Sequence, residues 1–327
     1  MQLTLEQIRA IAQGALSVVQ NAQGQFEFRR FTAYQQSCYD AVEAAFAEPA
    51  HATSGVRLAF MTDSAEFSFD YRVKSVTGRR FYYFDVFVDG VMVEHFGHEG
   101  LCEATSAANI KLPEGTHRVE VYFPCLFDTL VCNVTLDDGA MLAPVKKPRR
   151  MLCYGDSITQ GYDAVYPSQT YANLIADKLG CEMINQGVGG EIFRPELIDP
   201  DMGFDPDIIT VAYGTEDWSG LSRDAMVENA NGFFAKLRAT YPAARIFAIT
   251  PIWRADDARV TAVGSFAEGA EIVRNAAAAQ QGVIIVDGAR MIPHMPEVLA
   301  DGKMNPSDFG FKFYANALHK AMRPYFE

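Results

Sequence analysis

The segment with the clearest chemical character is a Gly-Asp-Ser turn near the middle of the chain. Residues 151–154 are apolar and predict a short buried strand, and Ser157 follows this run within a few residues. Ligands of parallel sheets bind beyond the carboxyl ends of the strands, which is where a nucleophilic hydroxyl has to stand. The turn therefore predicts a nucleophile at Ser157, although a serine at this position can also simply cap the next helix.

Three later segments also follow predicted strands, so their side chains would meet at the same edge of the sheet. They are Asn-Gln-Gly-Val-Gly-Gly-Glu at 185–191, Tyr-Gly-Thr-Glu-Asp-Trp at 213–218 and Asp-Gly-Lys-Met-Asn-Pro-Ser-Asp-Phe-Gly at 301–310. Together with Gly-Asp-Ser-Ile-Thr-Gln-Gly at 155–161, their order and spacing resemble the GDSL or SGNH hydrolase superfamily. The resemblance covers roughly residues 151–325 and implies a flavodoxin-like three-layer α/β domain with a parallel sheet.

The resemblance also implies catalytic roles for particular residues. Ser157 would be the nucleophile of an ester hydrolase, and the backbone N–H groups of Ser157 and Gly190 would form part of the oxyanion hole. Such donors must point at the negative oxygen that develops in the tetrahedral intermediate. Gly189 is the less suitable donor of the two adjacent glycines. We expect Asp156, Gly189 and Asp217 to lie on the substrate-binding side of this cleft.

One catalytic motif is altered at its amide donor. The family's Gly-x-Asn-Asp motif appears as Gly-Thr-Glu-Asp at 214–217, so Glu216 takes the place of the asparagine. An ionised glutamate only accepts hydrogen bonds. At ~4 Å from an oxyanion its charge would be repelled by about 4 kcal/mol at an effective dielectric constant of ~20. Burial could instead keep Glu216 protonated and able to donate.

A second motif is altered at the proton acceptor. The family's base is a histidine in an Asp-x-x-His motif near the C-terminus. Alignment on the following proline puts Asn305 at this position, whereas alignment on Asp301 puts Met304 there. Neither Asn305 nor Met304 accepts the Ser157 proton at neutral pH. His294, eleven residues before Asn305, could enter the cleft and serve as the acceptor.

Trp218, Trp253 and Arg254 follow the ends of predicted strands, where the cleft should lie. Aromatic faces suit sugar rings, and a guanidinium suits a carboxylate or phosphate. All three are therefore predicted to bind substrate, with burial in the core as the alternative for both tryptophans. A jelly-roll-like first domain joined to a GDSL-type second domain resembles certain acetyl-removing carbohydrate esterases, which favours a small acylated compound such as an acyl sugar.

Two clusters of metal-ligand residue types are not predicted to bind a metal. His95-x-x-His98-Glu99 has a plausible spacing, but it lacks a further ligand nearby and lies at the end of a hairpin strand. The acidic run at 199–207 contains two prolines and leads into an apolar stretch, which favours a solvated loop over a Ca²⁺ site. We expect no metal and no cofactor.

The two halves of the chain differ in the period of their apolar residues. Residues 1–24 open with a capping box and helical spacing through Ala15, which predicts a helix that packs on a β domain. Residues 25–143 form short alternating runs separated by turn signals, which predicts a β-sandwich of jelly-roll type. After a linker at 144–150, strands alternate with helices through 151–327, which predicts a parallel sheet covered on both faces.

The composition limits the partners of the protein. The chain has 327 residues, 49% of them hydrophobic, with 28 Lys and Arg against 41 Asp and Glu, a formal net charge of −13. Nucleic acid is held by clustered Lys and Arg, so it is not an expected partner. No run reaches the ~18 apolar residues of a membrane-spanning helix. Without a recognisable signal peptide or a disulfide framework among the six cysteines, we expect a cytoplasmic protein of unspecified oligomeric state.

The sequence supports three hypotheses about function. The first is an ester hydrolase in which Ser157 is the nucleophile and Glu216 or His294 is an unusual proton acceptor. The second is a binding protein for a sugar or acyl ligand on the same scaffold, because both the base and the amide donor are replaced. The third is a lyase or transferase that uses Glu216 and Asp217 as acid and base.

Overall fold

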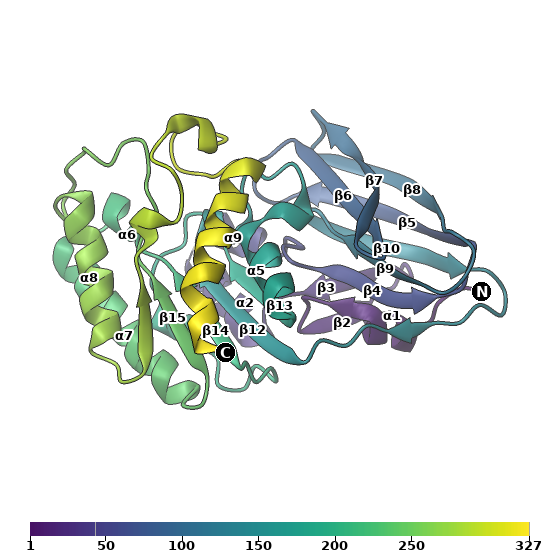
Figure 1. Cartoon of the computed structure of the whole chain (residues 1–327), viewed down its shortest axis with the longest axis horizontal. Coiled ribbons are helices and arrows are strands. Elements are labelled where there is room, and N and C mark those ends of the chain that lie inside the picture. The colour runs from purple at the N-terminus through teal and green to yellow at the C-terminus, as the bar shows by residue number, and fades with distance from the viewer. Residues whose placement is uncertain (43, 327) are drawn as a thin grey trace.

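The computed structural model describes residues 1–42 and 44–326 and contains two parts with different kinds of sheet (Figure 1). The first half of the chain forms two antiparallel sheets, and the second half forms a parallel sheet covered by helices. Within the described residues, no helix is both long and apolar enough to span a bilayer.

The first half folds as a sandwich. One sheet pairs its strands in the order β1 (Ala12–Gln13), β4 (Arg57–Thr62), β9 (His117–Tyr122), β6 (Phe81–Val88) and β7 (Val91–Glu99), with β11 (Ala143–Pro144) also on β4. The other follows the order β2 (Ser17–Gln20), β3 (Phe26–Arg29), β10 (Phe127–Leu136), β5 (Glu66–Ser75) and β8 (Glu103–Lys111). Successive side chains of a strand point to opposite faces, so Phe67, Phe69 and Tyr71 of β5 all enter the core between the sheets. The predicted antiparallel β domain is thereby confirmed.

The opening helix is shorter than the apolar spacing predicts. α1 (Leu5–Ile11) starts with the predicted capping box of Thr4 and Gln7. It ends at Ile11 instead of continuing to Ala15, because residues 12–13 pair with β4 as the edge strand β1. The first 24 residues therefore contribute strands to both sheets of the sandwich rather than only a helix packed on it.

Two helices between β3 and β4 are absent from the sequence prediction. They are α2 (Ala33–Val42) and α3 (Ala44–Ala50). Tyr39 of α2 and Ala50 of α3 pack with Val188 and Leu197 from the second half of the chain. These helices pack on the parallel-sheet domain instead of the sandwich. The strand pattern of the flanking residues therefore does not predict them.

The second half has a parallel sheet of the flavodoxin-like order. The strands pair as β13 (Cys181–Gly187), β12 (Arg149–Gly155), β14 (Ile208–Ala212), β15 (Arg245–Ile249) and β16 (Val283–Val286). The helices are α4 (Ser157–Gln160), α5 (Tyr171–Leu179), α6 (Thr215–Gly220), α7 (Arg223–Thr240), α8 (Phe266–Ala278) and α9 (Asp308–Met322). Short 3₁₀ turns are η1 (Pro167–Gln169), η2 (Pro195–Leu197), η3 (Gly288–Arg290), η4 (Pro296–Val298) and η5 (Arg323–Tyr325). The predicted three-layer domain is confirmed.

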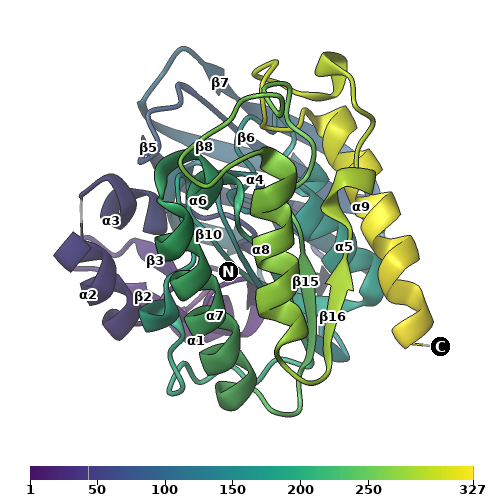
Figure 2. The same cartoon turned by 90° about the vertical axis from the view of Figure 1, so that its left-hand side faces the viewer.

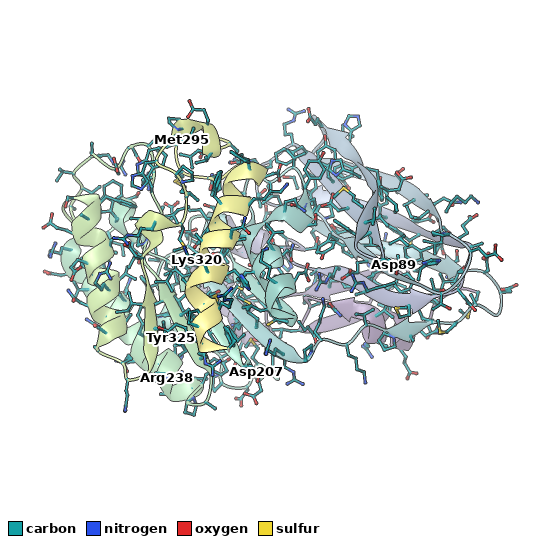
Figure 3. The ribbon with its side chains drawn as sticks, in the orientation of Figure 1. Asp89, Asp207, Arg238, Met295, Lys320 and Tyr325 are labelled. Atoms are coloured by element: carbon teal, nitrogen blue, oxygen red, sulfur yellow. The ribbon has the colours of Figure 1, made fainter. Side chains whose placement is uncertain are left out.

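Helices cover both faces of this sheet. Met151 and Cys153 of β12 pack with α5 and α9, whereas the alternate residues Leu152 and Tyr154 pack with α7 and α8. The ribbon shows these two pairs of helices on opposite sides of the sheet (Figure 2). In such a sheet, ligands bind beyond the carboxyl ends of the strands where the strand order reverses. Asp207, at the amino end of β14, marks the opposite edge of the sheet (Figure 3).

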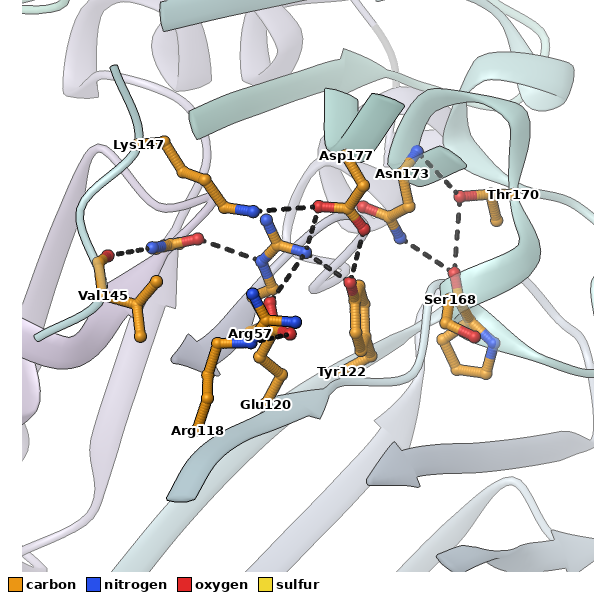
Figure 4. Close-up of polar contacts among 12 residues, drawn as sticks. Arg57, Arg118, Glu120, Tyr122, Val145, Lys147, Ser168, Thr170, Asn173 and Asp177 are labelled. Atoms are coloured by element: carbon orange, nitrogen blue, oxygen red, sulfur yellow. Dashed lines mark hydrogen bonds and ion pairs between the residues drawn. The ribbon is translucent and has the colours of Figure 1, made fainter. Parts of the chain in front are cut away.

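An ion-pair network around the buried Arg57 joins the two halves at one side of this sheet (Figure 4). Arg57 of β4 pairs with Asp177 of α5 at 2.9 Å, and the Tyr122 hydroxyl donates to the other oxygen of Asp177 at 2.7 Å. Gln13 accepts from Arg57 Nε at 3.0 Å and donates to the Val145 carbonyl at 2.6 Å, where the chain crosses between the halves.

A second buried cation joins the halves near the carboxyl ends of the strands. Arg30, directly after β3, is only 1% exposed. Its guanidinium donates to the carbonyl of Ala52 at 2.5 Å and of Pro49 at 3.3 Å in the first half of the chain. It also donates to the carbonyls of Asn185 and Gly187 in β13, the latter at 3.2 Å. Burial lowers the pKa of Arg30 to about 10, so the backbone carbonyls are what keep this charge inside the protein.

We expect Arg30→Met to lower the free energy of unfolding by roughly 3 kcal/mol, because it leaves several buried carbonyls without a donor. Urea denaturation at pH 7 measures this loss. The matched control is Arg72→Met, which breaks an exposed ion pair with Glu103 and should cost under ~1 kcal/mol. Equal losses in the two variants would contradict the structural role of Arg30.

Candidate active site

Ser157 begins α4 immediately beyond the carboxyl end of β12. The cap of this helix is Asp156, whose side chain accepts the Ile158 N–H at 3.0 Å. The Ser157 hydroxyl is therefore not consumed by capping and makes a different contact. Both residues are buried, with Ser157 3% exposed.

The contact partner of Ser157 is Asn305. Ser157 Oγ donates to Asn305 Oδ1 at 3.0 Å, and Asn305 Nδ2 donates to Asp301 Oδ2 at 3.1 Å. The other oxygen of Asp301 accepts the backbone N–H groups of Lys303, Met304 and Asn305 at 2.9, 2.8 and 3.0 Å. The alignment on the proline, which puts Asn305 at the position of the base, therefore agrees with the contact to Ser157. The arrangement has the connectivity of a Ser-base-Asp triad, but an amide oxygen stands where a base would be.

The glycine loop after β13 contains one free backbone donor. The Gly189 N–H donates to Gln160 Oε1 at 2.6 Å, whereas the Gly190 N–H has no acceptor among the described residues. Gly190 has φ +78°, and Gly189 lies so close to Tyr162 that a Cβ there would stand 2.3 Å from its hydroxyl oxygen. The geometry therefore favours Gly190 over Gly189 as an oxyanion donor.

Glu216 lies half-buried in the first turn of α6. Its carboxyl group makes no hydrogen bond or ion pair with any residue that the structure describes. Burial raises the pKa of Glu216, and the cations Arg254, Lys303 and Arg259 oppose this shift. Burial and the neighbouring Glu216 charge also raise the pKa of Asp156 well above its usual range. The acidic groups at this edge of the sheet therefore carry less charge than their number suggests.

Asp217 turns into the protein rather than toward Ser157. One of its oxygens accepts the Phe193 N–H at 3.1 Å, and the other is buried without a hydrogen-bond partner among the described residues. Burial raises the pKa of Asp217 to about 7. The geometry therefore does not support the hypothesis that Glu216 and Asp217 act on one substrate as acid and base.

Trp218 and Arg254, which are predicted to bind substrate, make their contacts within the protein. Trp218 is fully buried and donates to the Gly264 carbonyl at 3.0 Å, with the Arg254 guanidinium 5.0 Å from its ring centroid. Arg254 is itself buried and forms an ion pair with Asp256. Both residues stabilise the loop after β15, and Trp218 belongs to the hydrophobic core.

His294 and Trp253 form a separate pair. Their rings stack with centroids 5.3 Å apart, and His294 Nε2 hydrogen-bonds the Ala289 carbonyl at 2.7 Å. Both line a cavity of about 450 Å³ between α8 and the loops after β15 and β16. The contact that a base needs, with Ser157 Oγ, belongs to Asn305 instead of His294.

His95, from the cluster of metal-ligand residue types in the sandwich, contacts a carboxylate and two aromatic rings. His95 hydrogen-bonds the buried Asp85 at 2.7 Å and stacks between Tyr83 and Tyr166. Among the residues that the structure describes, no group of three or more His, Cys, Asp and Glu is arranged to hold a metal ion.

A serine at the carboxyl end of a flavodoxin-like sheet, with a glycine donor loop and a C-terminal acidic loop, defines a protein of the SGNH type. The chain belongs to the GDSL-like lipase/acylhydrolase family, whose model matches residues 153–318. No curated protein sequence matches the chain significantly.

Solved structures share the whole two-part architecture. The salicylyl-acyltransferase SsfX3 from a tetracycline biosynthetic pathway has a TM-score of 0.82 at 22% identity, over 96% of this chain and 94% of that one. A candidate GDSL-like lipase from Bacteroides ovatus has a TM-score of 0.76 at 15% identity, over 100% and 98%. A family two carbohydrate esterase from Clostridium thermocellum, in complex with cellohexaose, has a TM-score of 0.62 at 18% identity, over 84% and 93%. At these identities the likeness concerns the fold.

Asp217 should make the stability of the protein depend on pH. Its carboxyl titrates near 3.8 when unfolded and near 7 when folded, so the folded state holds the proton more tightly. The free energy of unfolding should therefore fall as pH rises from about 4 to about 7, by roughly 2–4 kcal/mol relative to Asp217→Asn. Urea denaturation of both proteins across this range measures the difference, and parallel curves would contradict the raised pKa.

Proposed function

We propose that the protein binds a small acylated compound, such as an acyl sugar, and cleaves its ester slowly with Ser157 as the nucleophile. The observation that carries the proposal is the 3.0 Å hydrogen bond from Ser157 Oγ to Asn305 Oδ1, which fixes the hydroxyl beyond the carboxyl end of β12. The Gly190 N–H, without an acceptor among the described residues, follows the neighbouring strand β13. When Ser157 Oγ adds to the ester carbonyl, its proton passes to water, and the carbonyl oxygen accepts hydrogen bonds from the backbone N–H groups of Ser157 and Gly190. The alcohol then leaves with a proton from water, and a second water hydrolyses the acyl-serine to the acid.

Slow turnover follows from the two replaced groups. Asn305 cannot take the Ser157 proton, and proton transfer of this kind contributes typically 10²–10⁴-fold to the rate. Glu216 replaces an amide donor, whose loss alone costs ~10²–10³-fold. Binding and the remaining oxyanion donors can still leave residual catalysis when a triad member is missing.

The acyl group is the substrate feature with most support. A salicylyl-acyltransferase and carbohydrate esterases, among them an acetyl xylan esterase from Butyrivibrio proteoclasticus, share the fold of this chain. These proteins are named for acyl transfer or for ester cleavage on carbohydrate, and both chemistries begin with attack on an acyl carbonyl. Transfer of the acyl group to a second alcohol is thus an alternative fate of the same intermediate.

The role of Ser157 is tested by hydrolysis of p-nitrophenyl acetate and acetylated monosaccharides. The native protein should exceed the buffer rate, and Ser157→Ala should return it to that rate. Ser37→Ala, at an exposed serine of α2, is the matched control and should keep the native rate. Equal rates for the native protein and Ser157→Ala would exclude nucleophilic catalysis by Ser157.

A second candidate function is binding of the same ligand without turnover, which the amide at position 305 favours. The combined change Asn305→His and Glu216→Asn separates the two functions. It should raise kcat/KM for p-nitrophenyl acetate at least ~100-fold through a restored base and donor. If the native protein binds acetylated sugar but only the double variant hydrolyses it, the binding function is the correct one.

A further inference from the structure

Arg79 of the sandwich domain contacts a residue beside Asn305. Arg79 lies in the loop between β5 and β6, and its guanidinium forms a two-pronged ion pair with Asp163, at 2.6 and 2.9 Å. The guanidinium also stands 5.0 Å from the ring centroid of Tyr162, which packs against Gly189 of the donor loop. A planar guanidinium held at both nitrogens fixes the position and the plane of a carboxylate.

Asp163 in turn contacts the partner of the serine. Asn305 Nδ2 donates to Asp163 Oδ2 at 3.2 Å and to Asp301 Oδ2 at 3.1 Å, so the amide nitrogen stands between two carboxylates. An amide NH₂ group has two hydrogens, one for each carboxylate, whereas a ring nitrogen of neutral histidine has at most one. With both hydrogens engaged, the amide oxygen has to face Ser157.

The position of Asp163 is maintained by these contacts. Its φ of +66° lies in the left-handed region, which is unfavourable for residues with a side chain and is tolerated best by Gly, Asn and Asp. A cavity of about 490 Å³ with walls from both domains, including Arg79, Phe81, Asp163 and Asp301, borders the network. A group entering this cavity would meet Arg79 and Asp163 directly beside the Ser157 partner.

We propose that Asp163, held by Arg79 of the sandwich domain, is a positioning residue that orients the side chain at position 305 toward Ser157. The proposal rests on the proposed function, since it concerns the same serine. Through Arg79, the sandwich domain then contributes to the active site. The two carboxylates beside residue 305 match the two hydrogens of an asparagine amide.

The test uses an imidazole at position 305 as a probe, in the full chain carrying Asn305→His. Adding Asp163→Asn removes a carboxylate beside the imidazole and should lower its pKa by about 1. Adding Arg79→Met removes the cation that neutralises Asp163 and should raise this pKa. Asparagine keeps the left-handed backbone of residue 163, and Arg79 is partly exposed, so both variants are compatible with the fold.

The pKa of the imidazole is read from its NMR chemical shifts, which require no catalysis. Arg80→Met is the matched control, because the Arg80 guanidinium binds the Gly100 carbonyl instead of Asp163 and its loss should shift the pKa less. Shifts of opposite sign support the positioning role. Shifts of the same sign, or shifts no larger than that of the control, overturn it, whether or not any variant hydrolyses esters.

A second measurement keeps the native asparagine. Asp163→Gly retains the backbone conformation and removes one acceptor, so the side-chain amide hydrogens of Asn305 should exchange with solvent about tenfold faster. Selective ¹⁵N-asparagine labelling reports this exchange. An unchanged exchange rate would show that Asp301 alone orients the amide and would refute the role of Asp163.

Discussion

The buried guanidinium of Arg30 is the constraint on which the arrangement of the two halves depends. A cation can remain inside a protein only when hydrogen bonds replace its lost hydration, and here backbone carbonyls from both halves supply them. Two of these carbonyls, of Asn185 and Gly187, belong to the strand that leads into the donor loop. The placement of the sandwich on the parallel sheet and the placement of the Gly190 amide are therefore set by the same contacts.

Asn305 separates the geometry of a catalytic triad from its proton chemistry. Its amide bridges Ser157 and Asp301 with distances that an imidazole would have, yet its oxygen has almost no affinity for a proton. The donors that the proposed function assigns to the oxyanion are backbone N–H groups, so they do not depend on the residue at position 305. Under that proposal, the site can still hold an acyl carbonyl although it activates the serine poorly.

The sequence predicts the sheets well because their signals are local. Alternation along β5 and the strand-helix alternation after residue 150 each depend on neighbouring residues, and the Gly-Asp-Ser turn indicates the position of Ser157. The contact between Arg79 and Asp163 spans 84 positions and has no local signal. The position of a residue after a strand also does not predict its burial, since Trp218 and Arg254 follow strand ends but are both buried.

Gln160 connects α3, in the first half of the chain, with the glycine loop after β13. Its amide nitrogen donates to the Pro49 carbonyl at 3.1 Å, and its amide oxygen accepts from the Gly189 N–H at 2.6 Å. A hinge motion between the halves would pull this side chain and tilt the adjacent Gly190 amide. The backbone geometry of the glycine loop is consequently coupled to the position of α3, and it is maintained only while the two halves keep their present arrangement.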